Sequence, residues 1–149
     1  KMEQELKEER DHHIGRIIHM ISHQLKRQGT SHEEITRLTP MQKHILTYIV
    51  FESTKQELYQ KDIEEEFQIR RSTASGILQL MEKNGFIVRE SVEKDARLKR
   101  ILPTEKAEKL RMQILNNIRE SEKKMKSGIP EKEIEICLSV LRRILKNIW

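Results

Sequence analysis

The sequence predicts a mainly helical, α+β fold in which a helix-turn-helix is followed by a β-hairpin and is flanked by long terminal helices. Three observations lead to this prediction. Residues 60–84 contain two short, apolar-backed helical segments separated by a turn. Residues 86–102 contain two β-prone runs around the turn Glu93-Lys94-Asp95. The segments on either side carry apolar residues at three- and four-residue steps, the spacing of amphipathic helices.

The composition is typical of a small protein with long, half-exposed helices. Of 149 residues, 36% are hydrophobic and 36% are charged. That length fits one domain, or a small domain with helical extensions. The net charge is +5, and residues 69–100 contain eight Lys and Arg residues against four Asp and Glu residues. Most of the net positive charge therefore lies there, where it can attract phosphate, although a solvated basic hairpin has the same composition.

What the sequence lacks argues against several classes of protein. The single cysteine, Cys137, permits no internal disulfide and argues against a cysteine-based zinc site. No apolar run approaches the roughly 18 residues that span a bilayer, and no signal peptide is visible, so we expect a cytoplasmic protein without a membrane partner. No Gly-rich phosphate loop, supported Ser/His/Asp pattern or apolar carboxylate pair is present, so we expect neither an enzyme nor a cofactor.

The N-terminal region is expected to be helical. Residues 2–28 predict one long helix, because apolar residues recur along it at helical steps. These residues include Leu6, Ile14, Ile17, Ile18, Ile21 and Leu25. Gly29 and Thr30 are expected to end this helix. Ser31 with Glu34 then fits a capping box for a second, short helix.

Three helices are expected in the centre of the chain. Thr39-Pro40 predicts the start of the first, with Thr as the cap and Pro at the first helical position. Residues 60–67 predict a second, short helix, and residues 71–84 a third that stops at Asn84-Gly85. The residues expected to be buried are Met41, Ile45, Leu46, Ile49 and Val50 in the first helix, Ile63 and Phe67 in the second, and Ala74, Ile77, Leu78 and Met81 in the third.

Two further helices are expected after the hairpin. Thr104 predicts the cap of a helix that runs to about Lys126, and Gly128 with Pro130 ends it. The last helix carries an apolar stripe with alternating four-three spacing, which is typical of a helix-packing seam. Because the small central domain cannot cover both terminal stripes, we expect a second copy of the chain to do so; an intramolecular bundle is the alternative. The predicted dimer interface comprises Leu6, Ile14, Ile17, Ile134, Leu138, Leu141, Leu145 and Ile148.

The central segment is expected to bind duplex DNA. The outer face of residues 71–84 is small and polar, which lets a helix approach base edges in the major groove. Near the hairpin tip, Arg97 suits a narrow minor groove. Asp95 is expected to stabilise the hairpin, either by accepting hydrogen bonds within the turn or by holding a neighbouring arginine in position. Arg100 is expected to add attraction for phosphate. The predicted DNA-binding residues are Arg70, Arg71, Ser72, Thr73, Ser75, Gln79, Lys83, Lys94, Arg97 and Lys99.

Three segments resemble, in order and spacing, the MarR family of winged helix-turn-helix transcription regulators. They are LTPMQKHILTYI, KDIEEEFQIRRSTASGILQLMEKNGFIVR and DARLKRILPTEKA. The more specific features are Asp95 with Arg97, and Met81 with Gly85. The resemblance implies a homodimer on a palindromic operator, with repression relieved by a small molecule, a metal or an oxidant. The corresponding domains are dimerisation helices at 1–38 and 105–149 around a DNA-binding domain at 39–104.

The sequence leaves the effector open. Peroxide-sensing members of the resembled family carry a reactive cysteine in the N-terminal helix, whereas Cys137 lies in the last helix and is expected to be a buried structural thiol. His19 and His23 are four residues apart, a spacing that suits a metal, but no third ligand is evident, so no metal is assigned. A small-molecule effector remains open as a partner. The alternative function is a winged-helix module that binds a protein, or DNA without sequence preference.

Overall fold

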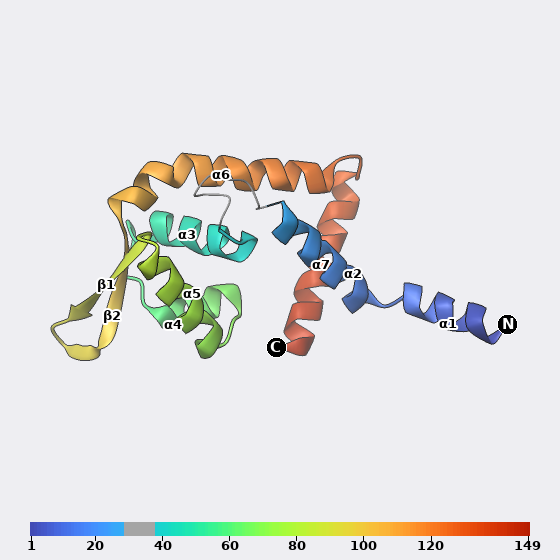
Figure 1. Cartoon of the computed structure of the whole chain (residues 1–149), viewed down its shortest axis with the longest axis horizontal. Helices are drawn as coiled ribbons and strands as arrows, with labels where there is room; N and C mark the ends of the chain where they lie inside the picture. The colour runs from blue at the N-terminus through green and yellow to red at the C-terminus, as the bar shows by residue number, and fades with distance from the viewer. Residues whose placement is uncertain (29–37) are drawn as a thin grey trace. The chain divides into compact units, whose positions relative to one another are not determined.

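The computed structural model describes residues 1–28 and 38–149, without the side chain of Ala96. These residues form helices and one two-stranded antiparallel sheet (Figure 1), which confirms the predicted mainly helical winged helix-turn-helix fold. The elements are α1 (Met2–Asp11), α2 (Ile14–Arg27), α3 (Pro40–Glu52), α4 (Gln60–Phe67), α5 (Arg71–Lys83), β1 (Ile87–Val92), β2 (Asp95–Pro103), α6 (Glu105–Lys126) and α7 (Glu131–Ile148). The chain divides into two compact units, Lys1–Met41 and Gln42–Trp149. The predicted domain limits at 38 and 104 remain predictions.

The single N-terminal helix predicted for residues 2–28 is wrong, because the helix is interrupted at His12 and His13. The backbone N–H of His12 donates to the Glu9 carbonyl at 3.1 Å, three residues back rather than four. The His12 ring Nδ1 lies 2.7 Å from the Glu8 carbonyl, the group that a continuous helix would pair with the His12 N–H. His13 is extended, with φ −76° and ψ 106°. The helix stop predicted at Gly29 and Thr30, and the capping box of Ser31 with Glu34 that predicts a short helix, lie outside the described residues.

The core of the second unit is formed by α3, α4, α5, the hairpin and α6. Its largest fully buried side chains are Ile45, Leu46, Ile49, Val50, Leu58, Ile63, Leu78, Met81, Ile87, Ile101 and Ile114. The predicted buried faces are thus largely confirmed. Ile77 and Phe67 are only half-buried. Phe67 is the last residue of α4, and its ring lies nearly perpendicular to that of Tyr48 at a centroid distance of 5.6 Å. In the first turn of α3, Met41 is 40% exposed rather than buried.

The β-hairpin is longer than predicted and is tied to the helix-turn-helix. β1 and β2 pair antiparallel from Ile87↔Pro103 to Ser91↔Lys99, and the register is irregular between Ser91 and Val92. Of the predicted turn Glu93-Lys94-Asp95, the structure confirms Glu93 and Lys94, whereas Asp95 is the first residue of β2. The Ile101 N–H also donates to the Leu58 carbonyl at 2.7 Å, so the segment before α4 pairs briefly with β2. This bridge fixes the base of the hairpin beside the start of α4.

Thr104 joins the end of α5 to the start of α6. Its hydroxyl oxygen accepts a hydrogen bond from the Ala107 N–H at 3.3 Å, which confirms the predicted cap. The same hydroxyl donates to the Gly85 carbonyl at 2.6 Å. Gly85 follows α5 with φ +79°, a left-handed conformation that suits glycine and that confirms the predicted stop. One threonine therefore sets where the chain leaves the hairpin for α6.

A buried lysine connects α3 to α6. Lys43 is 9% exposed, and its Nζ donates to Asn117 Oδ1 at 2.6 Å. Burial lowers the pKa of the Lys43 ammonium, because removing water disfavours the charged form. The hydrogen bond to a neutral amide satisfies one of the three ammonium donors and links the helix before the helix-turn-helix to the helix after the hairpin.

The last helix exposes its apolar side chains in the single chain. None of the residues of α7 is buried. Leu138, Leu141 and Leu145 are 40%, 41% and 44% exposed. Cys137 is also exposed, so the expectation of a buried thiol is wrong for one chain. Among the helices described, none combines the length and the apolar character needed to cross a membrane.

Candidate nucleic-acid interface

A cleft of about 480 Å³ lies between the helix-turn-helix and the hairpin. Five of its eleven lining residues are basic and one is acidic, so its charge favours an anionic partner. The lining residues are Tyr59, Gln60, Lys61, Glu64, Arg71, Ser75, Arg89, Arg97, Leu98, Lys99 and Ile101.

The cleft brings together four of the residues predicted to bind DNA. Arg71 and Ser75 come from α5, and Arg97 and Lys99 come from β2. The other predicted residues lie outside the cleft lining and are exposed. They are Arg70, Ser72, Thr73, Gln79, Lys83 and Lys94. The DNA contacts of both groups remain predictions.

Several residues of the cleft are not among those that the sequence predicts to bind DNA. Tyr59, Gln60 and Lys61 line it from the start of α4, and Arg89 lines it from β1. A signal for the first three was present in the sequence, because polar residues mark the start of the predicted helix at 60–67, the first helix of the helix-turn-helix. No comparable signal marked Arg89, whose Nε lies 3.3 Å from Glu82 Oε2 on α5.

The hairpin tip has the hydrogen bond expected of Asp95. Its Oδ1 accepts from the backbone N–H of Arg97 at 2.9 Å, which stabilises the turn. The Arg97 side chain is exposed and lines the cleft. Across the residues that the structure describes, its guanidinium forms no ion pair. The charge of Arg97 is therefore available to a ligand.

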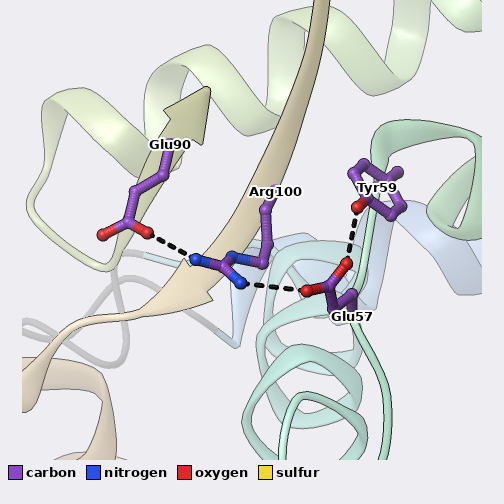
Figure 2. A network of polar contacts seen from close by, with 4 residues as sticks. All are labelled: Glu57, Tyr59, Glu90 and Arg100. Atoms are coloured by element: carbon purple, nitrogen blue, oxygen red, sulfur yellow. Dashed lines mark hydrogen bonds and ion pairs between the residues drawn. The ribbon is translucent and has the colours of Figure 1, made fainter. Parts of the chain in front are cut away.

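Arg100 has a different role from the one predicted. Its Nη1 donates to Glu57 Oε1 at 3.0 Å and its Nη2 to Glu90 Oε2 at 3.0 Å. The Tyr59 hydroxyl donates to the other oxygen of Glu57 at 2.7 Å. Figure 2 shows the guanidinium between the two carboxylates. The expectation that Arg100 offers free charge to phosphate is wrong, because two carboxylates already hold it.

The network also shifts the ionisation of its members. Hydrogen bonds from Tyr59 and then Arg100 hold the pKa of the Glu57 carboxyl below its usual value. The Glu90 and Glu57 carboxylates raise the pKa of Arg100, and the Glu57 carboxylate raises that of Tyr59. Glu57 precedes α4 and Glu90 lies on β1, so Arg100 connects the hairpin to the helix-turn-helix.

We expect Arg100→Met to loosen the hairpin without unfolding the chain. The substitution leaves Glu57 and Glu90 facing each other without a cation, so amide hydrogen exchange in β1 should become faster. DNA affinity should fall although the lost charge is not free to bind phosphate. Arg119→Met removes the same charge from the exposed face of α6 and is the control. Exchange in β1 that equals that of the control would show that the network does not hold the hairpin.

The described histidines of the N-terminal unit are His12, His13, His19 and His23. Across residues 1–28 and 38–149, no group of three or more His, Cys, Asp and Glu side chains is arranged to hold a metal ion.

Together, the helix-turn-helix, the hairpin and the cationic cleft define a winged helix-turn-helix protein. A model of the MarR family matches residues 38–98. The uncharacterized HTH-type transcriptional regulator YybA of Bacillus subtilis (strain 168) is 29% identical over 91 residues. The alignment covers 61% of this chain and 61% of that relative, so the match spans about three-fifths of the relative's length.

Solved structures match more of the chain. The transcription regulator MarR from Oenococcus oeni PSU-1 is 30% identical and has a TM-score of 0.72, with 90% of this chain and 99% of that chain covered. The S. aureus MepR–DNA complex has a TM-score of 0.80 at 27% identity, with 92% and 99% covered. The chain belongs to the MarR family.

Proposed function

We propose that this chain is a sequence-specific transcription regulator that binds duplex DNA as a homodimer. The observation that carries the proposal is the cationic cleft, in which Arg71 from α5 meets Arg97 and Lys99 from β2. Cations presented by two neighbouring elements suit the regular phosphates of a duplex. The MepR relative in complex with DNA supports the same partner.

The outer face of α5 is suited to the major groove. Ser72, Thr73 and Gln79 are exposed along it. A Cβ added at Gly76 would meet no atom within 4 Å, so the backbone there is open to a close partner. Hydroxyl and amide groups on such a face can read base edges, while Arg97 at the hairpin reaches an adjacent minor groove.

The dimer part of the proposal is supported by the apolar side chains that the single chain leaves exposed. In α7 these include Leu138, Leu141 and Leu145, and in α2 they include Ile14 and Ile17, which are 57% and 45% exposed. A contiguous apolar helix face of this kind marks an interaction surface, and a second copy offers the same face. Two copies would place two α5 helices on half-sites about 34–36 Å apart.

We propose further that the regulator is a repressor and that a small-molecule effector relieves the repression. Family membership alone supports this part of the proposal.

DNA binding is tested with the DNA upstream of the protein's own gene, titrated against random duplex in a fluorescence anisotropy assay. We expect preference for the upstream DNA and a steep loss of affinity with salt, by about 0.9 log unit per log unit of salt for each phosphate neutralised. Binding without preference would favour the non-specific module, and no binding would favour a protein-interaction module.

A further inference from the structure

Gln60 connects the first helix of the helix-turn-helix to the second. Its Nε2 lies 2.8 Å from Ser75 Oγ and 3.2 Å from the Arg71 carbonyl oxygen. A backbone carbonyl can only accept a hydrogen bond, so the Gln60 atom that faces it must be the amide nitrogen rather than the oxygen. The orientation of the amide is thereby fixed, and Ser75 Oγ accepts from Gln60.

The hydrogen bond from Gln60 leaves the Ser75 hydroxyl as a donor toward a further partner. A helical serine commonly donates its own proton to the carbonyl four residues back, which for Ser75 is that of Arg71. Gln60 already donates to that carbonyl and to the serine oxygen. Within residues 1–28 and 38–149 the Ser75 hydroxyl makes no further hydrogen bond. Its proton is therefore free for a ligand in the cleft, which Ser75 and Gln60 both line.

We propose that Ser75 donates a hydrogen bond to an acceptor atom of bound DNA, and that Gln60 is the positioning residue that makes Ser75 a donor. The inference rests on the proposed DNA binding. The acceptor is a phosphate oxygen or an acceptor on a base edge, both of which accept without donating. Arg71, Arg97 and Lys99 line the same cleft and bring an anionic strand within reach of Ser75.

A double-mutant cycle in the full-length chain tests this coupling. The probe is the duplex that the wild-type protein selects from a random pool, and the variants are Ser75→Ala, Gln60→Met and the double substitution. Ser75→Ala should weaken binding about tenfold, and Gln60→Met should weaken it by a similar factor. The double variant should bind no worse than Ser75→Ala, because Gln60 acts through the serine hydroxyl. Gln113→Met makes the same chemical change on the exposed face of α6 and should bind as wild type.

The outcomes distinguish a base-edge acceptor from a phosphate acceptor. They also distinguish failure of this inference from failure of the proposed DNA binding. Loss of base preference at one position of each half-site in Ser75→Ala indicates a base edge, whereas an equal loss on all duplexes indicates a phosphate. Circular dichroism and melting temperature check that each variant is folded. The inference is overturned if Ser75→Ala binds as wild type, or if Gln60→Met costs the same with and without Ser75. A wild-type chain that binds no duplex overturns the proposed function as well.

Discussion

Leu141→Glu is expected to convert the proposed dimer into monomers and to abolish binding to the proposed operator. Leu141 lies in the middle of the apolar face of α7, with Leu138 and Leu145 one turn away on either side. In a symmetric interface the substitution buries one uncompensated carboxylate from each copy. Each costs on the order of 3 kcal/mol, which raises the dissociation constant of the dimer by more than 100-fold.

The matched control is Ser139→Glu. It places the same charge on α7 two residues away, on the side opposite the apolar face. Sedimentation velocity of both variants at micromolar concentration should show a monomer for Leu141→Glu and a dimer for Ser139→Glu. Circular dichroism should show that both remain helical. A Leu141→Glu protein that stays dimeric and binds the operator normally would place the interface elsewhere.

Arg97→Ala is expected to weaken operator binding by roughly 10- to 100-fold, because a well-placed arginine contact contributes about 1–3 kcal/mol. Arg97 is exposed beside the cleft, and its backbone N–H is held by Asp95. The Asp95 bond uses only the backbone, so the alanine variant keeps the turn. The proposed dimer should be unaffected. The dependence of log affinity on log salt should become less steep, by a slope of about 1 for each protomer.

Lys124→Ala is the control for Arg97→Ala, because it removes one positive charge from the exposed face of α6 outside the cleft. Anisotropy titrations at three salt concentrations measure both the affinity and the slope. Equal affinities for the two variants would refute the assignment of the hairpin to DNA contact.

The regular parts of the fold follow from local sequence signals. The helix predicted at 60–67 has the bounds of α4. Gly85 is the predicted stop of α5, and Thr104 is the predicted cap of α6. These features depend on residues within one helical turn, where apolar spacing and capping chemistry act directly. Apolar periodicity does not predict the break at His12, where the His12 ring takes up the Glu8 carbonyl instead of the backbone N–H.

The composition of the candidate site was predictable only in part. Arg71, Ser75, Arg97 and Lys99 could be named because a basic, polar helix start and a basic hairpin are visible in sequence. The sequence could not show that they share a cleft, since that depends on the Leu58–Ile101 bridge between distant segments. Nor could it distinguish the free charge of Arg97 from the engaged charge of Arg100.

The class of fold, the order of its elements and the cationic character of the helix-turn-helix and hairpin all follow from local patterns in the amino-acid sequence. The tertiary structure decided which polar groups are already paired. Arg100 meets Glu57 across 43 residues of sequence, and Gln60 meets Ser75 across 15. The physical reason is that helical periodicity and capping act between near neighbours, whereas the pairing of a charge or the direction of a hydroxyl proton depends on distant groups that folding brings within about 3 Å.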